Sequence, residues 1–332
     1  MSEDGRRGRR PGPAPVPQGP PRTVVIGHVT TDVIVIPARP VVDGDDNEAA
    51  VRITPGGQAA NTAAWLAWQG TPVTLVTSVG DDADGRARIA ELTEAGVDCA
   101  ARRHPGVPTG SVVVVSFGGR RTMMSQRGAN VLLAPEDIDV ALIELPDAGH
   151  VHLSAYVLLD PVSRAAGLRA LAAAREHGLT VSVDAASAEL LRRTGTRRCL
   201  EWLRGIDLLI ANEDEARALT GHDRPGPAAG ALTATARQVA VKLGARGALW
   251  ADRDGALFTV AARPVDAVDT TGAGDAFAAG LLTALTSGAD ARTALRLAGE
   301  LGAAAVRVTG ARPGPRAPGG AVPATSQQRR QT

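Results

Sequence analysis

A turn of small residues near the C-terminal end of the chain could bind an anion and supply a base. Residues 266–280 read DAVDTTGAGDAFAAG: a short extended run, a turn through Gly272, Ala273 and Gly274, and an apolar stretch that predicts a helix. The first N–H groups of a helix lack intrahelical partners, so a turn almost without side chains lets a phosphate approach them. Asp275 would hold a carboxylate beside that anion, as phosphoryl transfer to a hydroxyl requires.

The same turn also has a purely structural interpretation, because small residues are common where helices begin and an Asp there is often only a cap. A second glycine-rich turn, Gly56-Gly57, precedes Asn61 and a predicted helix over residues 62–68. Paired glycines let a ligand hydroxyl approach the backbone, and an Asn amide offers a donor and an acceptor to a polyol. Alone, this turn equally fits a simple helix start.

Together and in this order, the two turns resemble the signatures of the ribokinase (PfkB) family of sugar and nucleoside kinases. The string from Asp269 to Asp275 is similar to the second signature. This resemblance implies that Asp275 is the catalytic base and that the three preceding N–H groups form the anion hole. The run from Gly56 to Asn61 is similar to the first signature, which lines the sugar pocket in that family.

Other positions extend the resemblance to the acceptor site. An acidic residue follows the first strand in the family and binds substrate hydroxyls, and Asp32 matches it here. Gly-Ala-Asn recurs after the lid in ribokinase-like members, which makes Asn130 a pocket candidate. The substrate-binding residues implied by the resemblance are Asp32, Gly56, Gly57, Asn61 and Asn130.

Three segments resemble the donor side of the family's site. Asn212 and Glu215 have the Asn-x-x-Glu spacing that helps to place Mg²⁺ and ATP phosphates partly through water, although acidic residues in a first helical turn are also ordinary partners of the helix dipole. Asp269 and Thr271 match a site for a monovalent cation such as K⁺. The nucleotide-binding residues implied are Asn212, Lys242, Gly244, Gly247 and Thr271, although a lysine at a strand end is more often a surface residue.

Alternating strands and helices with short links must position these residues, and this alternation predicts a mostly parallel sheet with helices on both faces, a three-layer α/β/α fold. Active sites of such folds lie beyond the carboxyl ends of the strands, where we expect Asp184, Asn212, Gly244 and Asp269. The strands are expected at residues 23–26, 73–76, 151–153, 179–184, 208–210 and 239–243, and the helices at 62–68, 84–94, 162–176, from 213, 276–285 and 291–307.

A small sheet is expected as a lid, formed by residues 32–55 and 108–125, with a hairpin around Gly118-Gly119. This sheet could also pair two subunits in a homodimer. The kinase domain is expected over residues 23–312. Residues 1–22 and 313–332 are rich in Pro, Gly and Arg and predict disordered tails.

Composition excludes several classes of protein. The chain has 332 residues and a net charge of +1, which argues against a nucleic-acid surface. Its apolar runs are too short to cross a membrane, and no signal peptide is expected. Cys99 and Cys199 are far apart and fit a reducing cytoplasm. A P-loop needs Gly-Lys-Ser/Thr, but Leu243 follows Lys242.

We therefore predict an ATP-dependent kinase that phosphorylates a hydroxymethyl group of a small sugar, with ATP and Mg²⁺ as cofactors. A nucleoside kinase of the same family and a non-catalytic sugar- or nucleotide-binding regulator are the alternatives. The acceptor stays open because Gln58 stands where ribokinases carry Lys, the segment His152-Leu153-Ser154 lacks the Glu that some sugar kinases have there, and Asp184 begins a turn unlike the usual Asn-Pro-Ala.

Overall fold

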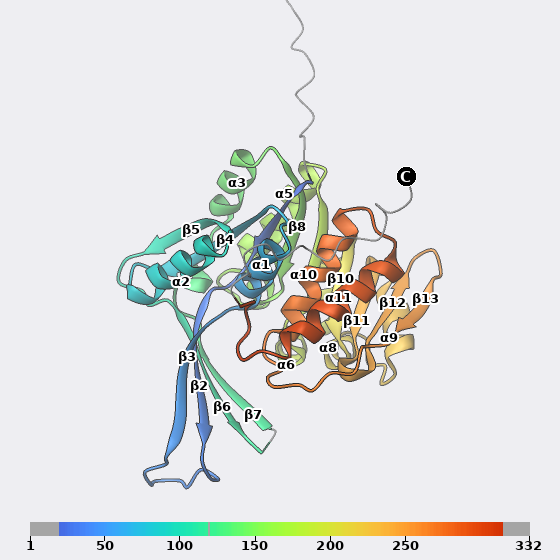
Figure 1. Ribbon diagram of the computed structural model, residues 1–332. Helices are drawn as coiled ribbons and strands as arrows, with labels where there is room; N and C mark the ends of the chain where they lie inside the picture. Colours follow the sequence, from blue (N-terminus) through green and yellow to red (C-terminus); the bar gives the residue numbers. More distant parts are fainter. Residues whose placement is uncertain (1–19, 119, 315–332) are drawn as a thin grey trace, which may run out of the picture.

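A computed structural model describes residues 20–118 and 120–314, and within these ranges a sheet of nine strands lies between two layers of helices (Figure 1). The predicted tails lie almost entirely outside the described residues. Arg22, which the sequence assigns to the N-terminal tail, is instead the first residue of β1. Its guanidinium pairs with Asp98 and Asp147, so the strand begins one residue earlier than its apolar run.

The central sheet has the order β13-β12-β11-β10-β9-β8-β1-β4-β5. Every neighbouring pair from β11 to β5 is parallel, whereas β12 and β13 extend the sheet antiparallel to their neighbours. Its strands are β1 (Arg22–Ile26), β4 (Val73–Gly80), β5 (Asp98–His104), β8 (Ala148–Ser154), β9 (Thr180–Asp184), β10 (Ile206–Asn212), β11 (Ala236–Lys242), β12 (Ala248–Asp252) and β13 (Leu257–Val260).

Helices cover both faces of this sheet, which confirms the predicted α/β/α layers. Val24 and Ile26 of β1 point into one apolar core and Val25 into the other, because successive side chains of a strand face opposite sides. The first core lies under α3 (Pro135–Glu144), α4 (Tyr156–Leu159), α5 (Arg164–Glu176), α6 (Ala188–Thr194), α7 (Thr196–Trp202), α8 (Glu213–Thr220) and α9 (Pro225–Leu232). The second lies under α1 (Gln58–Trp68), α2 (Ala83–Glu94), α10 (Ala273–Thr286) and α11 (Ala291–Ala305).

The lid strands form a second sheet that projects from the body (Figure 1). Its described strands are β2 (Thr30–Pro37), β3 (Ala49–Gly56), β6 (Gly110–Phe117) and β7 (Arg120–Gln126), in the order β3-β2-β6-β7. β2 runs parallel to β6, and the outer pairs are antiparallel. Gly119, at the tip of the predicted hairpin, lies outside the described residues. The separate small sheet is therefore confirmed.

Three local predictions needed correction. The helix expected over 62–68 already begins at Gln58, and the one expected over 276–285 begins at Ala273. The extended run before Asp269 joins neither sheet among the described strands. Instead, the N–H groups of Val268 and Asp269 donate to the carbonyl of Val306 at the end of α11 (2.8 and 3.2 Å). Asp269 therefore follows a loop rather than a strand.

Among residues 20–118 and 120–314, no helix combines the length and the apolar character needed to cross a membrane.

Candidate active site

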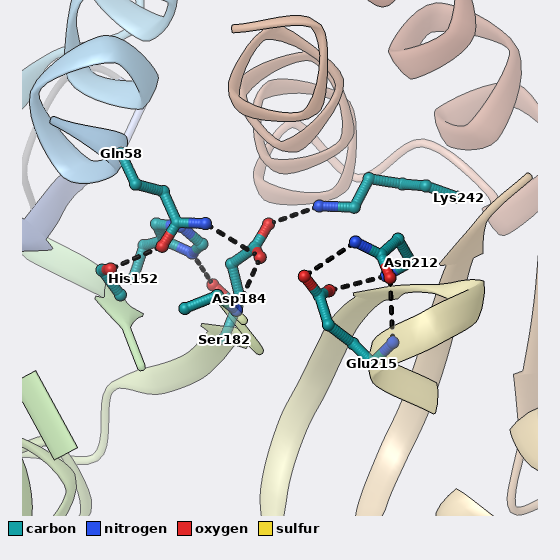
Figure 2. Close-up of polar contacts among 9 residues, drawn as sticks. Gln58, His152, Ser182, Asp184, Asn212, Glu215 and Lys242 are labelled. Carbon is teal, nitrogen blue, oxygen red and sulfur yellow. Dashed lines mark hydrogen bonds and ion pairs between the residues drawn. The ribbon is translucent and has the colours of Figure 1, made fainter. Parts of the chain in front are cut away.

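Four polar side chains meet at one edge of the central sheet. Ser154, Asp184, Asn212 and Lys242 are the last residues of β8, β9, β10 and β11. Parallel neighbouring strands end at the same edge, so these side chains gather there with Gln58 of α1 and Glu215 of α8 (Figure 2). The predicted edge of the sheet is thus where the polar network is found.

The anion turn lies at the N-terminus of α10. Gly272 precedes the helix with φ 74°, and a Cβ there would lie 2.4 Å from the carbonyl oxygen of Ala311, so only glycine fits. Among the described residues, no side chain caps this helix, and the N–H of Ala273 makes only a long 3.4 Å bond to Thr270. The amides of the first turn are therefore available to an anion, with Asp275 in the same turn.

One hydrogen bond joins the predicted base to the first glycine turn, which is the predicted acceptor turn. Asn61 Nδ2 donates to Asp275 Oδ2 over 2.9 Å. The two residues come from α1 and α10, whose predicted roles were drawn from separate motifs. A sugar held by the first turn would therefore present its hydroxyl beside the Asp275 carboxylate.

The surroundings of Asp275 suit a base at neutral pH. Burial raises the pKa of Asp275 to about 7, the hydrogen bond from Asn61 opposes that rise, and the negative charge of Asp184 adds to it. Lys242 lowers the pKa and Asp32 raises it further. A carboxylate with a pKa near the working pH can both take up and release a proton.

Lys242 carries the positive charge of the network. Its Nζ lies 2.8 Å from Asp184 Oδ2, and its side chain is mostly buried (16% exposed). Burial alone would disfavour the ammonium, but Asp184 and Glu215 outweigh it and raise the pKa of Lys242, so the residue stays charged. A Cβ built on Gly274 would lie 3.4 Å from Nζ, so the ammonium borders the anion turn.

The acceptor side is shaped by the lid and the first glycine turn. Burial raises the pKa of Asp32, although a 2.7 Å hydrogen bond from Thr30 Oγ1 lowers it. A Cβ on Gly56 would lie 2.2 Å from the Asp32 carboxylate, and one on Gly57, where φ is 96°, would lie 2.3 Å from the carbonyl oxygen of His28. Both glycines are thus required by close approach.

Asn130 has a structural partner. Its Oδ1 accepts from the N–H of Val29 (3.0 Å) and its Nδ2 donates to the carbonyl of the same residue (2.9 Å), and the side chain is buried. The amide therefore pairs with the backbone just before β2. This favours a role in holding the lid strand over the predicted role in binding substrate.

Gln58 and Asp184 belong to the polar network, although only Asp184 was expected at this edge of the sheet and neither was assigned a role. Gln58 Nε2 donates to Asp184 Oδ1 (3.1 Å), and its Oε1 accepts from the Ser154 hydroxyl (2.5 Å). Asp184 thus links the acceptor turn to Lys242 (Figure 2). The position of Asp184 at the end of a buried strand was the available signal for its role.

The donor side is an apolar cavity of about 530 Å³ beside the anion turn. Lys242, Gly244, Gly247 and Gly274 line it together with Phe277. At Gly247 φ is 103°, and a Cβ would lie 2.0 Å from the carbonyl oxygen of Val260. Of the predicted nucleotide residues, Asn212 and Thr271 do not line the cavity, whereas Thr270, the neighbour of Thr271, does.

Asn212 and Glu215 form a closed pair at the start of α8. The N–H and Nδ2 of Asn212 both donate to the Glu215 carboxylate (2.7 and 2.8 Å), and Asn212 Oδ1 accepts from the N–H of Glu215 (2.9 Å). Burial raises the pKa of Glu215. Within the described ranges, no group of three or more His, Cys, Asp or Glu side chains could hold a metal. Both Glu215 oxygens accept hydrogen bonds from Asn212, and a contact of this pair with Mg²⁺ through water stays a prediction.

The predicted cation residues anchor the anion turn. Asp269 Oδ1 accepts from the N–H and the hydroxyl of Thr271 (2.9 and 2.6 Å), and Oδ2 accepts from the N–H of Gly310 (3.1 Å). The Asp269 carboxylate thus ties the turn to the segment after α11.

Arg312 is a site residue that the sequence interpretation missed. Its side chain contacts Asn61 and the carbonyl of Gly56, both in the acceptor turn. No local pattern marks it, because it lies beside a tail rich in Pro and Arg.

Comparison with known proteins agrees with this geometry. The sequence pattern described as "pfkB family carbohydrate kinase" matches residues 21–317. The ATP-dependent ribose-1-phosphate kinase of Halopiger xanaduensis is 36% identical over 306 residues, which cover 89% of this chain and 95% of that protein.

Solved structures show the same fold. The Arabidopsis thaliana ribokinase complexed with ribose and ATP is 27% identical, with a TM-score of 0.72 and coverage of 88% of this chain and 94% of the other. An Escherichia coli protein assigned as ribokinase II, in complex with ATP and Mg²⁺, is 25% identical, with a TM-score of 0.76 and coverage of 88% and 94%.

The buried ion pair predicts a stability effect. We expect Lys242→Met to lower the free energy of unfolding by about 3–5 kcal/mol, because the buried Asp184 carboxylate loses its cation. Urea denaturation followed by circular dichroism measures this change. The double variant Lys242→Met/Asp184→Asn should recover part of the loss, because it removes both charges.

The matched control is Arg246→Met, which breaks an exposed ion pair with Glu213 (side chains 65% and 37% exposed). Exposed pairs contribute about 0–1 kcal/mol, so little change is expected. Equal unfolding midpoints for Lys242→Met and the wild type would contradict the role of the buried pair.

Proposed function

This chain belongs to the pfkB family of carbohydrate kinases, and we propose that it transfers the γ-phosphoryl group of ATP to a hydroxymethyl group of a small sugar. The hydrogen bond between Asn61 and Asp275 carries the proposal, because it puts the acceptor turn and the base in one pocket (2.9 Å). Ala273 and Gly274 of the anion turn also line the donor cavity. In the proposed arrangement the acceptor and the donor would therefore meet at the N-terminus of α10, beside the base, as an in-line transfer requires.

In the proposed mechanism, Asp275 takes the proton of the accepting hydroxyl as its oxygen bonds to the γ-phosphorus, while the bond from that phosphorus to the β,γ-bridging oxygen breaks and ADP leaves. The N–H groups of Gly272, Ala273 and Gly274 bind the charge that develops on the transferred phosphoryl oxygens. The Lys242 ammonium borders this turn and stabilises the same charge. Closure of the lid would exclude water, which otherwise competes as the acceptor.

The donor cavity suits the base and ribose of ATP, since small and apolar residues line most of it. Lys242, Gly244, Gly247 and Thr271 are the proposed nucleotide residues. Mg²⁺ would arrive with the ATP phosphates and neutralise part of their charge, and Asn212 and Glu215 would hold it through water. Asp269 and Thr271 are the proposed neighbours of a K⁺ ion beside the turn.

The acceptor would lie between the lid and α1, with Asp32, Gly56, Gly57 and Asn61 against its hydroxyls. The similarity to a ribose-1-phosphate kinase makes a ribose or a ribose phosphate the first acceptor to test. The two cysteines are free thiols, which fits the reducing cytoplasm where ATP is also found.

The decisive experiment is ATP turnover with a panel of acceptors: ribose, ribose-1-phosphate, deoxyribose, fructose and adenosine. We expect Asp275→Asn to lower kcat by about 10²–10⁴-fold while ATP binding is retained, because the base is lost and the anion turn remains. Calorimetry measures ATP binding in both proteins. Asp254→Asn, at an exposed turn after β12, is the control and should keep full activity.

Each outcome of the panel is informative. Turnover of a sugar supports the proposal, and preferred turnover of adenosine would replace it with a nucleoside kinase. ATP binding without turnover of any acceptor would indicate a regulator. Equal turnover in the Asp275→Asn variant would exclude Asp275 as the base.

The raised pKa of Asp275 predicts the pH dependence. A base acts only when ionised, so kcat/KM should rise with pH, reach half its plateau near pH 7 and fall about tenfold per unit below it. ATP affinity measured over the same pH range separates this effect from titration of the nucleotide. An acidic limb near pH 4, the ordinary range of an aspartate, would contradict the assignment.

We also propose that the lid sheet joins two copies of this chain. On one face, the paired strands align Ile53, Val33, Val113 and Met124, and this face is opposite to that of Asp32. Ile53 and Met124 are 70% and 54% exposed, an unusual exposure for apolar side chains on a sheet. A second lid would cover them.

Ultracentrifugation is expected to show a dimer that Ile53→Asp converts to a monomer, because a charge would be buried at the contact. Ile143→Asp, on the equally exposed Ile143 of α3 (73%), is the control and should leave the dimer intact. A wild-type monomer would end this proposal.

A further inference from the structure

The side chain of Arg312 lies in the acceptor end of the site and is almost buried (10% exposed). Its Nε donates to Asn61 Oδ1 (3.3 Å), and its Nη2 donates to the carbonyl of Gly56 (3.2 Å). Its Nη1 lies 3.7 Å from Glu91 Oε2. The guanidinium is therefore held against both ends of the glycine turn that opens α1.

These contacts determine which end of the Asn61 amide faces the base. The oxygen and the NH₂ group of an amide are alike in shape, but one accepts a hydrogen bond and the other donates. A guanidinium only donates, so Oδ1 must face Arg312 and Nδ2 must face Asp275, as the 2.9 Å bond to Oδ2 requires. If the Asn61 amide were turned the other way, its Oδ1 would face the Asp275 carboxylate. Repulsion between these oxygens would favour the protonated form of Asp275.

We propose that Arg312 is a positioning residue for phosphoryl transfer, which acts through Asn61 to keep Asp275 ready to accept a proton. The inference rests on the proposed role of Asp275 as the base. It adds a residue from the end of the described chain to the contact between Asn61 of α1 and Asp275 of α10.

The backbone of the segment that carries Arg312 is held by hydrogen bonds from Trp65 and to Asp269. Trp65 Nε1 donates to the carbonyl of Ala311 (3.0 Å), and the N–H of Gly310 donates to Asp269 Oδ2 (3.1 Å). Gly272 packs against Ala311 so closely that a Cβ would clash. The position of the guanidinium relative to the anion turn is therefore defined by the backbone, which a positioning role requires.

Several charged groups surround the contacts from Arg312 to Asn61 and from Asn61 to Asp275. A test must distinguish the effects of these charges from the effect of the contacts. Those that act on Arg312 or Asp275 are Asp32 on β2, Arg88 and Glu91 on α2, Cys99 on β5, Asp184 on β9 and Lys242 on β11. Arg88 is the informative one. It pairs with Glu91 (2.6 Å), and within the described residues it makes no hydrogen bond to Asn61 or Asp275. Its replacement changes the local charge but leaves the amide in place.

The experiment compares the pH profile of kcat/KM in the wild type, Arg312→Met, Arg312→Lys and Arg88→Met. Arg312→Met frees the amide to turn, so the acidic limb should move to higher pH by about one unit, with about tenfold lower kcat/KM below the limb. Arg312→Lys keeps a group that only donates and should follow the wild type. Arg88→Met should also follow the wild type.

A double-mutant cycle tests whether the effect passes through Asn61. Asn61→Ala should move the limb as Arg312→Met does, and the double variant should move it no further, because the two residues act in series. Thermal unfolding verifies that each variant is folded. If Arg312→Met does not fold, Arg312→Gln replaces it, because a Gln amide can present either end and does not lock Asn61.

The outcomes that would contradict the role of Arg312 can be distinguished from the one that would contradict the proposed function. Additive shifts in the double variant, or an equal shift in Arg88→Met, would mean that Arg312 acts only through its charge and would overturn the inference. An unchanged profile in Arg312→Met together with an inactive Asp275→Asn would also overturn it while the proposed function stands. An active Asp275→Asn would remove the proposed function itself.

Discussion

The site depends on one hydrogen bond, from Asn61 to Asp275, which joins two helices that begin at glycine turns. Two short side chains can meet only if the helices approach closely. Half of the buried residues of α1 and half of those of α10 are alanine, with Ala59 and Ala63 on one helix and Ala276 and Ala279 on the other. Small side chains allow the close contact, and the contact brings the acceptor turn to the base.

The charged side chains around this contact determine its chemical properties. Asp275, Asp184 and Glu215 gather around a single ammonium, Lys242, in a region with little water. Burial raises the pKa of Asp275, and the negative charge of Asp184 adds to this rise, whereas Asp184 and Glu215 keep Lys242 protonated despite its burial. In the proposed mechanism Asp275 is thereby tuned towards neutral pH as the base, and a charged ammonium borders the anion turn.

Local sequence patterns explain why much of the fold and part of the candidate site could be predicted. The anion turn was predicted from glycines before an apolar helix together with the resemblance to the family's second signature, and the edge of the sheet was predicted from polar residues after buried strands. The starts of α1 and α10 were placed too late, because Gln58 and Ala273 follow glycines and read as loop. The substrate-binding role of Asn130 stays a prediction, and the sequence did not reveal that its amide pairs with the backbone of Val29.

The sequence by itself determined the alternation of strands and helices, the two glycine turns and the residue types that they carry, because each depends on neighbours within a few positions. Only the tertiary structure decided the partners: Asn61 meets Asp275 across 214 residues, and Arg312 meets Asn61 across 251. Such pairs leave no periodic pattern in the chain. They follow from how helices pack on a sheet, and that packing is the sum of many weak contacts rather than the property of any one segment.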